Sequence, residues 1–156
     1  MQDITTPQFI TVSVPGGLHD PSRTIEAVWN RGLGRYTATS VTVARPMAPV
    51  VTDDLSASAV RRNIAAGVRT QLLEANPELA AQRIFQTWVD PDRKGRPIRA
   101  KFAAEPTDDL LHTASLIVRL ERIAGGFPVR TLQRCLGIEH ADAKRWMGRL
   151  KRKELI

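Results

Sequence analysis

The chain has 156 residues, of which 42% are hydrophobic and 25% are charged. This length fits one ordinary domain or two small ones, and the composition excludes a chain that is disordered throughout. Cys135 is the only cysteine, so no intramolecular disulfide can form, which favours a reducing compartment. The sequence contains neither a signal-peptide pattern nor an apolar run as long as a membrane span. We therefore expect a cytoplasmic protein with no membrane partner.

Positive charge is concentrated near the end of the sequence. Lysine and arginine number 23 and aspartate and glutamate 16, which gives a net charge of +7. Residues 128–153 alone hold eight basic and two acidic side chains. Such a cluster attracts a polyanion through electrostatic steering and counterion release. An ordinary solvated surface is the alternative interpretation of the same charges.

The first third of the sequence predicts a three-stranded antiparallel β-meander. Strand-forming residues alternate with polar ones over 9–14, 24–30 and 36–44. Turns that contain glycine separate these segments, and their short length favours hairpins.

Helical periodicity begins after the third strand. Thr52, followed by Asp53 and Asp54, is typical of a helix start, because an oxygen acceptor and acidic residues suit the positive end of a helix. Asn76 ends this helix and Pro77 begins a second one. The apolar face of the first helix is Val60, Ile64, Val68 and Leu72, and that of the second is Leu79, Ile84, Phe85 and Trp88.

A loop and a third long helix follow. Residues 90–106 lack periodicity and are interpreted as a basic linker, which is either a solvated loop or a contact to a phosphate backbone. Thr107 begins the next helix, and Gly125 with Gly126 ends it through a left-handed cap. The basic residues of the linker are Arg93, Lys94, Arg96, Arg99 and Lys101, and the expected buried stripe of the helix is Leu110, Ala114, Ile117, Leu120 and Ala124.

The last segment predicts two short helices joined by a sharp turn. Leu132 and Leu136 lie four residues apart and share one face of the first helix, which begins at Pro128. Gly137 follows, where a sharp turn requires a positive φ angle, and Ile138 plugs the turn. The inward face of the second helix is Ala143, Trp146 or Met147, and Leu150. This is a helix-turn-helix, whose second helix has the shape to enter a major groove.

The segment 128–156 resembles the DNA-binding helix-turn-helix of bacterial regulators, both in the turn Leu136-Gly137-Ile138 and in its ending. The ending, 150–156, is similar to the junction between an arginine-rich helix and the wing of winged-helix proteins. Gln133 replaces the small residue that is usual in the first helix, and Glu139 replaces the usual Ser or Thr cap. More loosely, the whole chain is similar to uncharacterised actinobacterial proteins, many of them from mobile elements.

The resemblance implies which side chains face DNA. The outward face of the second helix is then His140, Ala141, Lys144, Arg145 and Gly148. Of these, Lys144 and Arg145 are placed to reach base edges. The later residues Arg149, Lys151, Arg152 and Lys153 are placed for phosphates, which position a protein without reading sequence. A plain basic helix and a protein-interaction module are the two alternatives for this segment.

Reactive side chains do not converge in the sequence. His19, His112 and His140 are scattered and have no metal-ligand spacing to other residues, so we expect no metal and no cofactor. Both Asp-Asp pairs follow a threonine at a helix start, where capping is the simpler role, and Cys135 is interpreted as a packing residue. Aromatic residues are too few, at 5%, for a platform that stacks single-stranded nucleic acid. We therefore expect no enzymatic activity, and we expect Trp29, Trp88 and Trp146 to lie in the core.

The sequence thus predicts an α+β protein, in which a three-stranded antiparallel β-meander with two helices precedes a trihelical helix-turn-helix domain. The expected domains are 1–89, a linker over 90–106, and 107–156. The predicted function is that of a double-stranded-DNA-binding protein, a transcriptional regulator that forms a homodimer through its N-terminal sheet. The alternative is a non-catalytic adaptor whose helix-turn-helix binds a protein.

Overall fold

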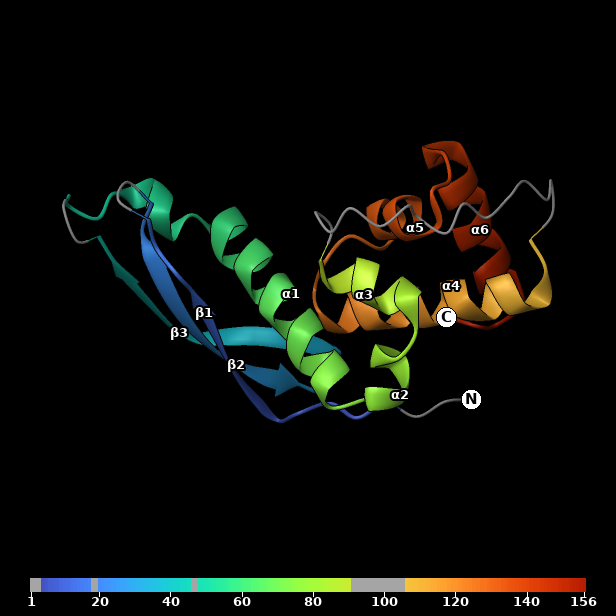
Figure 1. Cartoon of the computed structure of the whole chain (residues 1–156), viewed down its shortest axis with the longest axis horizontal. Coiled ribbons are helices and arrows are strands. Elements are labelled where there is room, and N and C mark those ends of the chain that lie inside the picture. Colours follow the sequence, from blue (N-terminus) through green and yellow to red (C-terminus); the bar gives the residue numbers. More distant parts are fainter. Residues whose placement is uncertain (1–3, 18–19, 46–47, 91–105) are drawn as a thin grey trace. The chain divides into compact units, whose positions relative to one another are not determined.

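The computed structural model describes residues 4–17, 20–45, 48–90 and 106–156. Three strands come first and helices follow, which is the α+β fold that the sequence predicts (Figure 1). The chain divides into two compact units, one formed by 1–75 with 123–126 and the other by 76–122 with 127–156. No helix among the described residues has both the length and the apolar character needed to cross a bilayer.

The first unit contains a meander of antiparallel strands, β1 (Phe9–Val14), β2 (Ser22–Asn30) and β3 (Arg35–Ala44), in the order β1-β2-β3. Ile10 pairs with Ala27 in the first hairpin, and Ile25 pairs with Val41 in the second. A bulge between Glu26 and Ala27 shifts the register of β2 against β3. The strands lie within two residues of their predicted bounds, because alternation and glycine turns mark both ends.

Helix α1 (Ala57–Glu74) covers one face of this sheet (Figure 1). Its residues Ile64, Val68 and Leu72 are buried as predicted, whereas Val60 is only half-buried. The helix backbone approaches β1 closely at Gly67, where an added Cβ would lie 2.3 Å from Cγ2 of Val12. From the sheet, the buried residues are Ile10, Val12, Ile25, Ala27 and Tyr36.

Two aromatic residues of the sheet, Trp29 and Tyr36, pack against each other. Tyr36 is buried and its hydroxyl donates to the carbonyl of Pro7, and burial raises the pKa of Tyr36 to about 12. Trp29 packs edge-on against Tyr36, with 5.3 Å between ring centroids. Trp29 is half-buried, so its predicted place in the core is only partly correct. Trp88 and Trp146 are buried as predicted.

The predicted helix start at Thr52 is wrong. Residues Thr52–Leu55 form a short 3-10 turn, and α1 is capped by Ser56, whose hydroxyl accepts from the amide of Ala59 at 3.4 Å. Asp54 is buried, and Arg45 donates to both of its carboxylate oxygens at 2.8 and 2.7 Å. These hydrogen bonds hold the pKa of Asp54 below its usual range. Asp54 thus anchors the end of β3 instead of capping a long helix.

The second unit consists of helices. They are α2 (Pro77–Ala80), α3 (Arg83–Val89), α4 (Asp108–Ile123), α5 (Pro128–Leu136) and α6 (His140–Arg152). The single helix expected after Pro77 is broken, because Gln82 has an extended backbone (φ −88°, ψ 124°). Its apolar residues Leu79, Ile84, Phe85 and Trp88 are nevertheless buried as predicted.

The chain passes from the first compact unit to the second after Ala75, and not at the expected boundary near 89. The reason is that α3 packs in the helical unit, where Trp88 is fully buried and donates its indole N–H to Glu121 of α4 at 2.8 Å. Most of the predicted basic linker, residues 91–105 with its five basic side chains, lies outside the described residues.

Helix α4 begins as predicted, because the amide of Leu110 donates to the hydroxyl of Thr107 at 3.3 Å. It ends in a left-handed turn at Gly125, whose φ angle is +72°. Along the predicted stripe, Ala114, Ile117, Leu120 and Ala124 are buried, and Leu110 is half-buried. The buried surface is wider than one stripe, since it also contains Leu111, Ser115, Leu116, Val118 and Glu121.

We expect Gly67→Ala to destabilise the first unit, although alanine favours helices more than glycine does. The new methyl would overlap Val12, and overpacking of this kind costs about 1–3 kcal/mol. Gly148→Ala is the matched control, since a Cβ there would meet only the guanidinium of Arg152, at 3.7 Å, and should add about 1 kcal/mol of stability. Urea denaturation of both variants measures the difference. Equal stabilisation by the two substitutions would contradict the close helix–sheet contact.

Candidate nucleic-acid interface

Helices α5 and α6 are joined by the sharp turn that the sequence predicts. α5 ends at Leu136, and Gly137 has φ 64° and ψ 33°, the left-handed conformation that a residue without Cβ adopts at little cost. The amide of Ile138 donates to the carbonyl of Gln133 at 3.2 Å and closes the turn. α6 begins at His140. The chain therefore contains a helix-turn-helix at residues 128–152.

The facing sides of the two helices are apolar. Leu132 and Leu136 of α5 are fully buried, as are Ala143 and Leu150 of α6, and Trp146 is 8% exposed. Met147, the alternative to Trp146, is half-buried, and so is the plug residue Ile138. A small side chain at Ala143 lets the helices approach closely. These contacts fix the rotation of α6 about its axis and thus decide which of its residues face solvent.

The predicted DNA-facing residues lie on α6 or directly after it. Gly148 and Arg149 are half-buried, which makes them less accessible than the sequence indicated. The exposed ones are His140, Ala141, Lys144, Arg145, Lys151, Arg152 and Lys153. The opposite side of α6 is the buried apolar face, so the exposed basic residues and the core residues occupy different sides of one helix.

Gln133 and Glu139, the two residues that differ from the usual helix-turn-helix pattern, both lie near the start of α6. Glu139 occupies the N-cap with an extended backbone (φ −71°, ψ 158°), but its carboxylate makes no capping hydrogen bond within the described part of the chain. Gln133 reaches from α5, and its side-chain oxygen lies 3.0 Å from Nδ1 of His140. A hydrogen bond between side chains of α5 and α6 thus supports the turn, where a side-chain N-cap is usual.

The basic residues of α6 differ in their electrostatic partners. Arg145 pairs with Asp142, one helical turn earlier. Lys153 pairs with Asp108 at the start of α4, with 2.8 Å between Nζ and Oδ1, and this hydrogen bond lowers the pKa of Asp108. The cations without a carboxylate partner among the described residues are Lys144, Lys151 and Arg152.

Two basic residues of α5 have structural roles. Arg134 is half-buried and donates to the carbonyl of Trp88 at 3.2 Å. The guanidinium of Arg130 lies over the ring of Phe127, 5.8 Å from its centroid. Arg134 is thereby partly withdrawn from the surface available to a polyanion, whereas Arg130 remains exposed.

A buried carboxylate that the sequence analysis missed supports the helix-turn-helix. Glu121 of α4 is fully buried. Its two oxygens accept from the indole N–H of Trp88, at 2.8 Å, and from the backbone amide of Phe127, at 2.9 Å. Phe127 directly precedes α5, so Glu121 fixes the start of α5 against α3 and α4. The sequence held a signal, because Glu121 continues the four-residue spacing of Ile117 on the apolar stripe.

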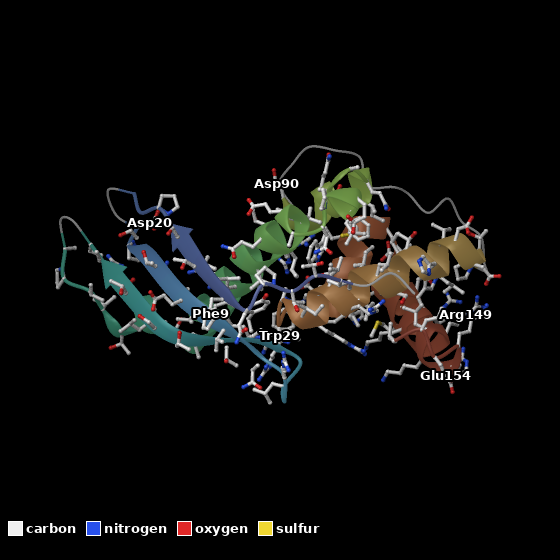
Figure 2. All side chains as sticks on the ribbon, turned by 90° about the horizontal axis from the view of Figure 1, so that it is seen from below. Phe9, Asp20, Trp29, Asp90, Arg149 and Glu154 are labelled. Carbon is white, nitrogen blue, oxygen red and sulfur yellow. The ribbon has the colours of Figure 1, made fainter. Side chains whose placement is uncertain are left out.

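The end of α6 is also held by α4. α6 ends at Arg152, and Glu154, two residues later, has a positive φ angle of 54° (Figure 2). The amide of Leu155 then donates to the carbonyl of Leu150 at 2.9 Å. The carbonyl of Leu155 accepts from the hydroxyl of Ser115 in α4 at 2.7 Å. The last residues thus pack back on the second unit.

The remaining chemical candidates are the single cysteine and the other two histidines. Cys135 is buried in the core of the second unit, in agreement with a packing role. His112 is exposed on α4, and His19 lies outside the described residues. Where the structure describes the chain, no three His, Cys, Asp or Glu side chains gather in a group that could hold a metal ion.

We expect Glu121→Ala to lower the free energy of unfolding by at least about 2 kcal/mol, because a buried donor left unpaired costs about 1–3 kcal/mol and two donors lose their acceptor. Glu121→Gln keeps one carbonyl oxygen and should lose less. Arg122→Ala removes an exposed neighbour and serves as the control, with a change within about 0.5 kcal/mol. Urea denaturation followed by tryptophan fluorescence compares the three variants. A Glu121→Ala protein as stable as the control would exclude this role.

Comparisons of the chain with protein-family models, with curated proteins and with solved structures find no match. The charge, burial and geometry of the described residues are therefore the basis for assigning a function.

Proposed function

We propose that the protein binds double-stranded DNA and acts in the cytoplasm as a transcriptional regulator, with α6 as its recognition helix. The observation that carries the proposal is the division of α6 into two faces. Ala143, Trp146 and Leu150 are buried against the unit, while Lys144 and Arg145 are exposed on the other side. A helix of 13 residues is ~20 Å long, and the major groove admits one helix of this diameter.

The ion pair of Arg145 favours a role in base reading over one in backbone binding. Asp142 neutralises part of the charge of Arg145 and restricts its guanidinium to one region, which lowers the entropy cost of an oriented hydrogen bond. Arginine recognises guanine with two parallel hydrogen bonds, which requires such an orientation. We assign base reading to Lys144 and Arg145, and we place His140, Ala141 and Gly148 on the same groove-facing side of α6.

The later cations are assigned to phosphates. Lys151 and Arg152 are exposed at the end of α6, one to two turns beyond Arg145, where a helix leaving the groove passes the DNA backbone. Arg149 and Lys153 belong to the same group by position. Two carboxylates, Asp108 and Glu154, lie near Lys153, whereas Glu139 and Asp142 lie at the other end of the helix. Lys151 and Arg152 have no carboxylate partner among the described residues.

The proposal includes a homodimer, because one recognition helix reads too few bases for useful specificity. The outer strands β1 and β3 each have an edge that pairs with no further strand among the described residues. We expect the first unit to associate through such an edge. Light scattering at tens of micromolar, with and without DNA, measures the mass. A monomer under both conditions would contradict this part of the proposal and leave α6 as the only contact to DNA.

We expect Arg145→Ala and Arg152→Ala to weaken DNA binding in different ways. Loss of a base contact should cost about 1–3 kcal/mol on the true site and reduce discrimination against random duplexes. Loss of a phosphate contact should weaken binding to all duplexes alike and make the salt dependence shallower by about one unit. Fluorescence anisotropy at several salt concentrations, on duplexes selected by the wild-type protein and on random ones, measures both effects.

Two outcomes would contradict the regulator. Equal effects of the two substitutions on selected and random DNA would leave only a basic surface. Absence of salt-dependent duplex binding would instead favour the adaptor, whose apolar interface to a protein need not weaken as salt rises.

A further inference from the structure

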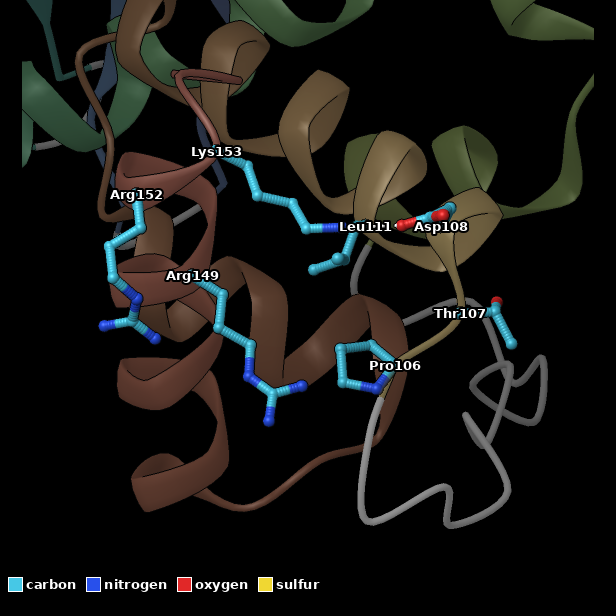
Figure 3. A pocket seen from close by; sticks show the side chains of 7 residues that line it. All are labelled: Pro106, Thr107, Asp108, Leu111, Arg149, Arg152 and Lys153. Atoms are coloured by element: carbon cyan, nitrogen blue, oxygen red, sulfur yellow. Dashed lines mark hydrogen bonds and ion pairs between the residues drawn. The ribbon is translucent and has the colours of Figure 1, made fainter.

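A cavity of about 450 Å³ lies within the second unit, between the start of α4 and the end of α6 (Figure 3). Its size is within the range of small-ligand sites. Basic side chains come from α6 and its end, and an apolar wall comes from the start of α4. The lining residues are Pro106, Thr107, Asp108, Leu111, Arg149, Arg152 and Lys153.

Two of the three cationic side chains at this cavity extend toward the start of α4, whereas that of Arg152 points away from it (Figure 3). Figure 3 shows Arg149 and Lys153 extending from α6 and its end toward the start of α4. Three of the seven lining residues are cationic, and only one, Asp108, is acidic. Arg149 and Lys153 outnumber Asp108, which suits an anion, and a guanidinium and an ammonium offer several N–H donors to oxygen atoms.

Asp108 forms an ion pair with one of these cations, Lys153. Its carboxylate lies 2.8 Å from Nζ of Lys153, and the side chains of the pair are 88% and 54% exposed. Exposed ion pairs contribute little net free energy, because water solvates both partners when they separate. Lys153 can therefore exchange Asp108 for a stronger anion at small cost.

We propose that the cavity binds one phosphate group, which takes the place of Asp108 on Lys153 and is also held by Arg149. A phosphate group presents more acceptor oxygens than a carboxylate, and a planar guanidinium matches two of them at once. Asp108 then acts as an internal competitor that lowers the affinity for phosphate. The phosphate belongs either to a DNA backbone, in which case the inference rests on the proposed function, or to a small phosphorylated molecule.

The first experiment needs no DNA. Inorganic phosphate is titrated into the full chain at constant ionic strength, and backbone amide shifts in NMR spectra measure its affinity. Lys153→Gln should weaken binding at least about fivefold, whereas Arg122→Gln, which removes an exposed charge elsewhere on α4, should not. Asp108→Asn should strengthen binding by about fivefold, and Asp109→Asn, the same change one residue later and outside the lining, should leave it as it was.

The second experiment separates the two sources. A labelled duplex is bound to the chain, and inorganic phosphate is added while the ionic strength is kept constant. Release of the duplex, together with tighter duplex binding by Asp108→Asn than by Asp109→Asn, identifies the DNA backbone as the source. Phosphate binding with no effect on the duplex identifies a small phosphorylated molecule.

The proposal is overturned if phosphate binds the wild type no better than Lys153→Gln, or if Asp108→Asn and Asp109→Asn behave alike in the phosphate titration. These outcomes concern the cavity alone. A chain that binds phosphate but no duplex would instead reject the proposed DNA binding and keep the cavity site.

Discussion

The arrangement of helices in the second unit depends on the hydrogen bonds that the buried carboxylate of Glu121 accepts. A carboxylate removed from water is costly unless hydrogen-bond donors replace the lost solvent. Here one donor is the indole of Trp88 in α3 and another is the amide of Phe127 before α5. The requirement to satisfy one group thus joins three helices. It also fixes where α5 begins. Because the turn at Gly137 is short, the position of α5 then determines where α6 begins.

The surface charge of the second unit follows from this arrangement more than from the number of basic residues. Arg134 is half-buried and donates to the carbonyl of Trp88, so it is not a simple surface cation, whereas Arg130 stays exposed over the ring of Phe127. In α6 the apolar contacts of Trp146 and Leu150 set the rotation of the helix. Lys144 and Arg145 are exposed because they lie on the other side. The charge count predicted a basic segment, and packing decides which cations in it can meet a polyanion.

Local signals predicted the elements well where the cause of the structure is itself local. Alternation gave the strands, and Gly137 gave the turn before α6, because a positive φ angle is costly for other residues. The predictions failed where a distant contact decides. Asp54 looked like a helix-start residue, but Arg45 draws it into a buried ion pair and Ser56 caps α1 instead. Neither glycine nor proline marks the break near Gln82.

The sequence predicted most of the exposed residues of the candidate site, but not the buried contacts that hold its helices in place. Periodicity predicted the exposed positions of α6 except at Gly148 and Arg149, which are half-buried. The domain boundary was placed too late, because the helical period of 77–89 does not reveal that Trp88 packs on α4. Glu121 was missed because a charged residue on an apolar stripe is normally assigned to the solvent side. Its place on the stripe of Ile117 was the one signal that it is buried.

The carboxylates of the second unit divide its cations into two classes. Asp142 pairs with Arg145 and Asp108 pairs with Lys153, whereas Lys144, Lys151 and Arg152 have no carboxylate partner among the described residues. Unrestrained lysine and arginine side chains attract any polyanion at long range, whereas a restrained one gains less from charge alone and more from a partner of matching geometry. In the proposed regulator, Lys151 and Arg152 attract the DNA backbone, and Arg145, which Asp142 orients, discriminates between bases. The separation of these tasks follows from the ion pair of Arg145 and from the packing that fixes α6.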